Sequence, residues 1–334
     1  MRIAIIGPGA MGCLFGGLLA RAGHEVILVD KDSARARTLN ENGIRVEGVS
    51  GTSPAVGLRP TGGPSPAVVP MHRDAGGKLR ARVRATADAA SVEDPDLALV
   101  CVKAYDTARV AESAAPLLRR SETVLTLQNG LGNVEILQKV AGAERVVGGT
   151  TAQGATLLGA GHVRHAGAGI TILGEPSGRI TGRLRRIAAV LRQAGMQVRL
   201  TRDLQSVLWN KLIVNCAINA LGALTGLPNG ALPQYPGTRR LLQQAADEAA
   251  AVAKAMGIKV MAHPARKIEM MCRQTAPNLN SMLQDVMRRR KTEVQAINGT
   301  VAEHGRRLGI ATPVNATLAA LVATIEATYA QRAL

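Results

Sequence analysis

Short apolar runs alternate with helix-like segments through the first half of the chain. Residues 2–6 form an apolar run that ends at Gly7, and residues 10–21 then have helical composition, so the opening predicts a strand, a turn and a helix. The same patterns predict strands over 26–29, 97–102, 123–127 and 145–148, and helices over 108–118 and 133–140. This alternation is typical of a parallel sheet with crossover helices.

The pattern changes after about residue 202, where long segments rich in Ala, Leu and Met follow a helical period. They predict helices over 205–221, 238–256, 264–272, 280–308 and 317–329. We therefore expect an α/β first domain over residues 1–202 and an all-helical second domain over residues 203–334.

One segment of the first domain fits neither pattern. Residues 51–77 hold five prolines and six glycines among 27 residues, which sustain neither a helix nor a central strand. We interpret the segment as a loop or insertion and expect a mobile surface excursion.

Composition excludes several classes of protein. The 334 residues are 46% hydrophobic and 19% charged, which excludes full disorder. The nearest candidate for a membrane span, residues 3–20, is interrupted by five glycines and a proline and continues a fold element, so neither a span nor a signal peptide is expected. The four cysteines are far apart without metal-ligand spacing and are interpreted as buried free thiols. We expect a cytoplasmic protein with no metal.

The net charge of +17 raises the question of nucleic acid. However, the basic residues are spread along the chain, and five aromatic residues are too few for base-stacking platforms. Nucleic acid and other polyanions therefore stay a secondary alternative, and a homodimer is left open.

The first chemical signal is the run Gly7-Pro8-Gly9-Ala10-Met11-Gly12, a GxGxxG placed where a strand meets a helix. The first glycine permits the tight turn, the second lets the backbone approach a pyrophosphate at the helix N-terminus, and the third allows close packing of helix and strand. Asp30 follows Gly12 by 18 residues, at the end of the second strand. This context predicts a Rossmann-like NAD(P)-binding domain.

The identity of the dinucleotide depends on two opposing signals. Asp30 would bind the ribose hydroxyls of NAD and repel the 2′-phosphate of NADP, whereas Lys31, Arg35 and Arg37 would attract that phosphate. In the alternative interpretation, Asp30 caps the next helix and the basic residues are a solvated face.

The second signal lies in the helical segment 209–219, where Lys211, Asn215 and Asn219 recur every four residues among apolar neighbours. The three side chains share one face of a helix. A solvent-facing stripe is one interpretation; we favour a stripe that faces a ligand, because the rest of the helix is too apolar for free exposure and buried polar groups need partners.

Two further sets of residues are candidates. Lys103 and Asn129 follow the strands predicted at 97–102 and 123–127, and ligands of parallel sheets bind beyond the carboxyl ends of strands. They could also be a surface lysine and a turn asparagine. Ser281 and Glu293 lie in the segment 278–293, where the pattern alone indicates a helix start with a solvated basic face.

Together these residues resemble the ketopantoate reductase (2-dehydropantoate 2-reductase) family over nearly the whole chain. The motifs that carry the resemblance are specific by their order and spacing: Gly7 to Gly12, Val-Lys-Ala at 102–104, Gln-Asn-Gly at 128–130, Gly-Gly-Thr-Thr at 148–151, Trp-x-Lys-Leu-x-x-Asn-x-x-x-Asn at 209–219, Pro-Asn-Gly at 228–230, Ser-Met-Leu-Gln-Asp at 281–285, Glu293 and Ile-Asn-Gly at 297–299.

The resemblance implies NADPH-dependent reduction of 2-dehydropantoate to (R)-pantoate, a step toward pantothenate and coenzyme A. It implies Lys211 as proton donor and Glu293 as the acid that completes the active site. The implied cofactor contacts are Gly7, Pro8, Gly9, Ala10, Met11, Gly12, Lys31, Lys103, Asn129, Ala155 and Glu293. The implied substrate contacts, for a small 2-keto acid, are Asn129, Lys211, Asn215, Asn219, Asn229 and Ser281.

Two features depart from the family. Asp30 beside Lys31 leaves NADH open as an alternative cofactor, and residues 51–77 look like an insertion that the family lacks. The remaining alternatives are a reductase of another small 2-keto acid and a non-catalytic dinucleotide-binding protein.

Overall fold

The computed structural model describes residues 1–48 and 79–331, so the predicted insertion at 51–77 lies outside the described residues. The chain forms two compact units. The first comprises Met1–Gln128 and Asn133–Leu204, and the second comprises Asn129–Gly132 and Gln205–Leu334. The main division therefore follows residue 204, and the short segment Asn129–Gly132 belongs with the helical second unit.

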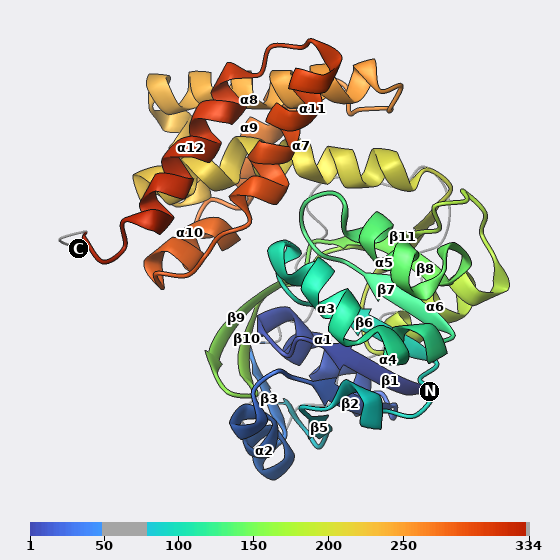
Figure 1. Cartoon of the computed structure of the whole chain (residues 1–334). Coiled ribbons are helices and arrows are strands. Elements are labelled where there is room, and N and C mark those ends of the chain that lie inside the picture. The colour runs from blue at the N-terminus through green and yellow to red at the C-terminus, as the bar shows by residue number, and fades with distance from the viewer. Residues whose placement is uncertain (49–78, 332–334) are drawn as a thin grey trace. The chain divides into compact units, whose positions relative to one another are not determined.

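The first unit is built on a mainly parallel sheet (Figure 1). Among the described residues, eight strands lie in the order β12-β11-β8-β7-β6-β1-β2-β5. Their bounds are β1 Arg2–Ile6, β2 Glu25–Val29, β5 Arg84–Thr86, β6 Leu97–Val100, β7 Thr123–Thr126, β8 Val146–Thr151, β11 Thr171–Gly174 and β12 Val198–Thr201. The β8–β11 pair is antiparallel, and the other pairs are parallel.

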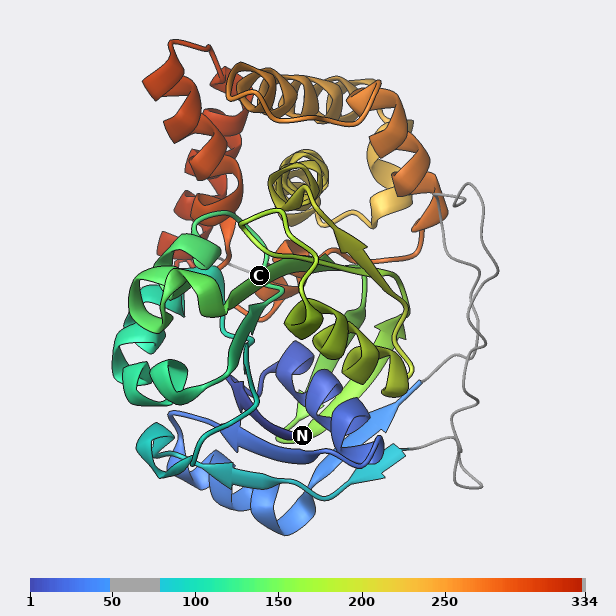
Figure 2. The same ribbon diagram turned by 90° about the vertical axis from the view of Figure 1, so that its right-hand side faces the viewer.

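Helices cover both faces of this sheet, as expected for crossover connections (Figures 1 and 2). One face carries α1 and α6, and the opposite face carries α3, α4 and α5. The helices and short helical turns are α1 Ala10–Arg21, α2 Ser33–Asn42, η1 Ala89–Ser91, η2 Ala104–Asp106, α3 Thr107–Ser113, α4 Ala115–Arg120, α5 Asn133–Ala141, η3 Ala143–Arg145 and α6 Gly182–Gln193.

The single helix predicted over 108–118 is wrong, because α3 ends at Ser113 and α4 begins at Ala115. Pro116 stands in the first turn of α4. A proline ring clashes with the carbonyl four residues before it and removes a donor, so the helix is interrupted there.

A second, smaller sheet of the first unit was not predicted. Its order is β4-β3-β10-β9, with β3 at Ile44–Glu47, β4 at Leu79–Ala81, β9 at Gly154–Gly159 and β10 at His162–Gly167. The strands are short, and β10 pairs parallel to β3 and antiparallel to β9. Strands this short, and the pairing of β3 with the distant β10, leave little periodic signal in the sequence.

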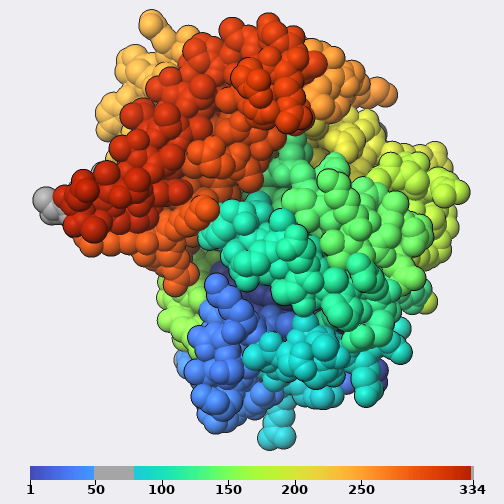
Figure 3. All heavy atoms as spheres, in the orientation of Figure 1, coloured from blue at the N-terminus to red at the C-terminus, as the bar shows by residue number. Residues whose placement is uncertain are grey.

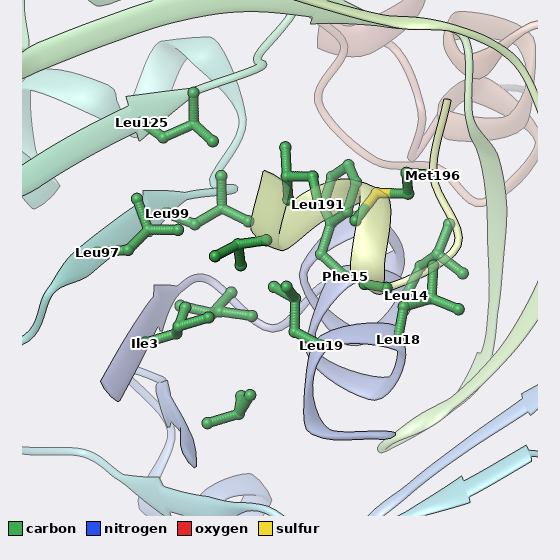
Figure 4. Close-up of a cluster of buried hydrophobic side chains, with 14 of the residues drawn as sticks. Ile3, Leu14, Phe15, Leu18, Leu19, Leu97, Leu99, Leu125, Leu191 and Met196 are labelled. Atoms are coloured by element: carbon green, nitrogen blue, oxygen red, sulfur yellow. The ribbon is translucent and has the colours of Figure 1, made fainter. Parts of the chain in front are cut away.

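The core of the first unit lies between the larger sheet and helices α1 and α6 (Figure 4). Leu14, Phe15 and Leu19 of α1 meet strand residues such as Leu97 and Leu99, all nearly inaccessible to solvent. Leu191 of α6 and Met196 after it complete the cluster. Burial of these side chains fixes α1 on the sheet and thereby places the turn that precedes it.

The second unit is helical, as predicted. Its elements are α7 Leu204–Thr225, η4 Asn229–Gln234, α8 Pro236–Ala255, α9 Pro264–Gln274, α10 Ser281–Met287, the π-helical turn η5 Gln295–Gly299, α11 Thr300–Leu308 and α12 Pro313–Ala327. In Figure 2, α7 is viewed nearly along its axis with other helices of the unit around it. In Figure 3, the outer face of α12 lies at the surface, whereas its Leu318 and Val322 are buried.

The continuous helix predicted over 280–308 is wrong. It breaks after Met287, where Arg289 adopts a left-handed backbone with φ of 50°, and regular structure resumes only near η5. Left-handed conformations do not continue an α-helix, so the basic run 288–291 forms a connection. The prediction that a helix begins at Asn280 holds to within one residue, because Asn280 caps α10 through Leu283 N.

Helix α7 is the core helix of the second unit. Trp209, Ile213, Cys216 and Ala217 are at most 1% exposed. Among the described residues it is the one helix long and apolar enough to cross a membrane, but 67% of its most apolar window is buried inside the fold. Its hydrophobicity is therefore accounted for by packing.

We predict that Gly12 is required for stability, whereas Gly9 is not. A Cβ at Gly12 would lie 2.3 Å from the carbonyl oxygen of Gly7, whereas a Cβ at Gly9 would meet no heavy atom within 4 Å. Gly12→Ala should cost about 1–3 kcal/mol, the usual range for overpacking. Thermal unfolding of both alanine variants tests this; equal melting temperatures would contradict it.

Candidate functional site: the glycine-rich turn and the buried face of α7

The glycine-rich turn sits at the carboxyl end of β1. Gly7 has φ of 89°, a conformation that disfavours other residues, and a Cβ there would lie 2.5 Å from the Val102 side chain. Gly7 N donates to Val29 O, which ties the turn to the end of β2. The space beside Gly9 is open to a ligand. The three glycines thus occupy positions that require a tight turn, an open approach and close packing, respectively.

The N-terminus of α1 fits a phosphate group. Gly9 is its N-cap and supplies no side-chain acceptor, whereas Asp32 caps α2 by accepting from Ala34 N and Arg35 N. The first N–H groups of a helix lack intrahelical partners and attract anions. Pro8, Ala10 and Met11 complete this turn. The pyrophosphate of a dinucleotide would therefore be held by backbone groups of the turn.

Asp30 does not cap the following helix, which corrects that alternative. The carboxylate is 2% exposed and forms an ion pair with Arg35. Arg35 donates from Nε to one carboxylate oxygen and from Nη2 to the other, at 2.8 Å for the second contact. This hydrogen bonding raises the pKa of Arg35. Arg35 is thus not a free cation, while Lys31 is exposed.

The other cofactor candidates of the first unit lie on different elements. Lys103 precedes η2, just beyond the end of β6. Since β6, β1 and β2 are parallel neighbours, the glycine-rich turn, Asp30 with Lys31, and Lys103 follow the same edge of the sheet. Ala155 lies on β9 of the smaller sheet and packs against the core of the first unit.

The polar face of α7 is largely buried, which argues against a solvent-facing stripe. Asn215 and Asn219 are 6% and 5% exposed, and Lys211 is half-buried one turn before Asn215. Neither the Lys211 ammonium nor the Asn219 amide forms a hydrogen bond or ion pair with another described residue. Buried polar groups without protein partners are costly unless water or a ligand satisfies them.

Asn129, Asn215 and Glu293 form a chain of hydrogen bonds within the second unit. Asn215 Nδ2 donates to Asn129 Oδ1 at 3.3 Å, and Asn129 Nδ2 donates to Glu293 Oε2 at 3.4 Å. Glu293 is 6% exposed. The structure therefore brings Asn129 and Glu293, 164 residues apart in sequence, to the polar face of α7.

Local geometry explains how these two residues reach α7. A Cβ at Gly130, which has φ of 80°, would lie 2.7 Å from Ala296 O of η5, so the segment Asn129–Gly132 packs closely on the π-helical turn. The residue before Glu293, Thr292, is anchored because its backbone N and hydroxyl both donate to Glu326 of α12. Both ends of the chain of hydrogen bonds are thus fixed by packing.

Burial shifts the pKa of Lys211. Removal of water from around the ammonium lowers its pKa from the ordinary lysine value of 10.5. A lysine whose proton is released more readily is a better acid near neutral pH. The arrangement can therefore stabilise a negative oxygen and give it a proton.

The two remaining substrate candidates lie elsewhere in the second unit. Asn229 is 8% exposed, donates from Nδ2 to the Thr275 hydroxyl, and has a buried Oδ1 without a partner among the described residues. Ser281 is exposed at the first position of α10. The structure does not bring Asn229 or Ser281 into the Asn215–Asn129–Glu293 chain.

Sequence reasoning missed the ion pair of Asp30 with Arg35 and the membership of Asn129 in the second unit. The five-residue spacing of Asp30 and Arg35 was visible, but the turn between them hides their contact. Over the described residues, no group of three His, Cys, Asp or Glu residues could hold a metal ion. The four cysteines are free thiols, although Cys101 is only partly buried.

Comparisons with known proteins cover both units. The family model described as ketopantoate reductase PanE/ApbA matches residues 3–178, and its C-terminal counterpart matches residues 203–326. A 2-dehydropantoate 2-reductase of Halobacterium salinarum is 38% identical over 325 residues, which is 96% of this chain and 98% of that protein.

Solved structures agree with this fold. A PanE/ApbA family ketopantoate reductase from Ralstonia eutropha has a TM-score of 0.83 and 33% identity, covering 98% of this chain and 99% of that one. A D-mandelate dehydrogenase with NADH and anilino(oxo)acetate has a TM-score of 0.82, covering 98% of this chain and 99% of that one, but is 24% identical and shows the fold alone. By family models that span both units and by full-length relatives, the chain belongs to the ketopantoate reductase PanE/ApbA family of oxidoreductases.

Proposed function

We propose that this protein reduces 2-dehydropantoate to (R)-pantoate with NADPH, in the cytoplasm. The observation that carries the proposal is the buried polar face of α7, where Lys211 and Asn219 lack partners among the described residues and Asn215 is linked through Asn129 to Glu293. The full-length relatives named 2-dehydropantoate 2-reductase support the choice of substrate. The substrate would be a small anionic 2-keto acid, with no part for nucleic acid or membrane.

Lys211 acts as the proton donor in this proposal. Reduced nicotinamide, when bound, supplies the hydride that adds to the keto carbon. Lys211 faces the carbonyl oxygen, stabilises the negative charge that develops there, and transfers one proton from Nζ to it, so that a hydroxyl forms. The neutral amine then regains its proton from water. The lowered pKa of Lys211 favours this transfer.

The amides and Glu293 position the substrate. Asn219 and Asn229 have amide groups suited to a carboxylate or hydroxyl, and Ser281 adds a hydroxyl donor in the proposal. Asn129 is held on both sides, by Asn215 and by Glu293, so its amide orientation is fixed. Glu293 would accept from the substrate hydroxyl and would repel the substrate carboxylate, which sets the direction in which the keto acid binds.

The proposed cofactor contacts belong mainly to the first unit. The turn from Gly7 to Gly12 would hold the pyrophosphate, and Lys31 would pair with the 2′-phosphate. Lys103 and Ala155 are proposed to contact the cofactor, together with Asn129 and Glu293 of the second unit, as the family resemblance implies.

Substrate and cofactor are tested together. We expect oxidation of NADPH to be faster with 2-dehydropantoate than with pyruvate, 2-oxobutyrate or phenylglyoxylate, and kcat/KM to be higher with NADPH than with NADH. Spectrophotometric rates with each pair measure this. A higher kcat/KM for another keto acid would identify a different 2-keto acid reductase, and no turnover with any of them would indicate a non-catalytic dinucleotide-binding protein.

We predict that Lys211→Met lowers kcat by about 10²–10⁴, the usual contribution of a positioned general acid. Methionine keeps much of the side-chain volume but has no proton to donate. Lys254→Met on α8 is the matched control, because Lys254 is exposed in the same unit. Steady-state kinetics of the folded variants measure the effect. A kcat within about threefold of wild type would reassign Lys211 to packing or binding.

The same assignment predicts a pH dependence. Burial lowers the pKa of Lys211, so the protonated form, which is the acid, is lost as the pH rises through a value below 10.5. The kcat for keto acid reduction should therefore fall on the alkaline side with a midpoint below that value. Rates measured across the alkaline range test this. If the residual kcat of Lys211→Met shows the same alkaline decrease as wild type, Lys211 is not the group that titrates.

A further inference from the structure

Arg35 forms an ion pair with Asp30, the carboxylate that would repel the 2′-phosphate of NADP. Asp30 follows β2, and its side chain is 1% exposed, whereas that of Arg35 is 35% exposed. Both carboxylate oxygens accept from the guanidinium, through Nε and Nη2. The third nitrogen of the guanidinium, Nη1, forms no hydrogen bond with another described residue. Arg35 is thus the outer member of the pair.

The pair lies beside the glycine-rich turn. Asp30 follows directly after Val29, whose carbonyl oxygen accepts from Gly7 N. Burial raises the pKa of the Cys13 thiol in the first turn of α1 to about 12, and the charges of Arg35 and Asp30 act on it in opposite directions. The ion pair therefore follows directly after the strand end to which the glycine-rich turn is hydrogen-bonded.

Backbone hydrogen bonds fix the first turn of α2, which carries Arg35. Asp32 caps α2 and accepts from Ala34 N and Arg35 N, so the start of the helix is well defined. Asp32 N in turn donates to Asp30 Oδ1 at 3.0 Å. The Asp30 carboxylate thus accepts from one backbone amide and from two nitrogens on one edge of a guanidinium. Its lone pairs are largely used, and little capacity is left for ribose hydroxyls.

This geometry resolves the conflict between Asp30 and its basic neighbours. A bare carboxylate at the end of β2 would bind the ribose hydroxyls of NAD and repel a 2′-phosphate. A carboxylate neutralised by a guanidinium loses that repulsion. A guanidinium also presents donors in a planar fork that matches phosphate oxygens.

We propose that Arg35 is a specificity-determining residue for the 2′-phosphate, in addition to Lys31, because it neutralises Asp30 and offers its remaining donors to the phosphate. The inference rests on the proposed use of NADPH and adds a residue to it. In NADPH complexes the 2′-phosphate would meet Arg35 from the side opposite Asp30. Without Arg35, Asp30 becomes an acceptor for ribose hydroxyls, and the site favours NAD.

Calorimetric binding of NADP⁺, NAD⁺ and the fragments 2′,5′-ADP and 5′-AMP tests this without turnover. Arg35→Ala should lower the affinity for NADP⁺ and for 2′,5′-ADP by about tenfold or more, because a charge-assisted contact with the phosphate is lost. Binding of NAD⁺ and 5′-AMP should be unchanged or tighter. Arg185→Ala is the matched control, because Arg185 is an exposed arginine on α6 of the same unit and is not a candidate for the phosphate.

A second pair of variants separates recognition from folding. Arg35→Ala leaves the buried carboxylate without its partner, which could destabilise the fold. Asp30→Asn with Arg35 intact should bind NADP⁺ at least as tightly as wild type. Adding Arg35→Ala to Asp30→Asn should again lower the affinity for NADP⁺ by about tenfold, and this double variant has no unpaired carboxylate at residue 30.

The outcomes distinguish this inference from the proposed function. If Arg35→Ala loses no more NADP⁺ affinity than Arg185→Ala does, or loses NAD⁺ affinity equally, the role of Arg35 is overturned even when wild type reduces 2-dehydropantoate with NADPH. If the loss is selective for NADP⁺ but wild type reduces no keto acid, the proposed function fails and the role of Arg35 stands.

Discussion

Burial of the polar face of α7 is the constraint on which the second unit depends. An ammonium or amide removed from water costs several kcal/mol unless it finds partners. Asn215 finds one in Asn129, and Asn129 finds another in Glu293. Lys211 and Asn219 have none among the described residues. Such unpaired groups in a core helix lower the stability of the fold, and a polar ligand that pairs with them would offset this cost.

Two segments bring Asn129 and Glu293 to the polar face of α7. Asn129 lies in a segment that the chain sends into the second unit from between β7 and α5, and it returns to the first unit after Gly132. Gly130 permits this segment to pack on η5, and Thr292 anchors the approach to Glu293 through Glu326. In the first unit, β1, β2 and β6 are neighbours whose carboxyl ends share one edge of the sheet, where we propose that the dinucleotide binds.

Two features that depend on residues close together in the sequence were predicted correctly. The period-four recurrence of Lys211, Asn215 and Asn219 placed them on one helix face, and the glycine spacing placed the turn at the end of β1. The break at Arg289 was not predictable, since a left-handed arginine has no compositional signature. The smaller sheet, the placement of Asn129 and the pairing of Asp30 with Arg35 depend on tertiary contacts, which a periodicity cannot report.

Two basic side chains illustrate why a net charge of +17 says little about what each cation does. Removal of water acts on both Lys211 and Arg35 and by itself lowers the pKa of each. Among the described residues no carboxylate forms an ion pair with Lys211, so the effect of desolvation persists and the proton is more easily given up. Hydrogen bonding to Asp30 outweighs desolvation at Arg35 and raises its pKa, so its charge is permanent. A neighbouring carboxylate thus separates a cation suited to holding a phosphate from a cation suited to donating a proton.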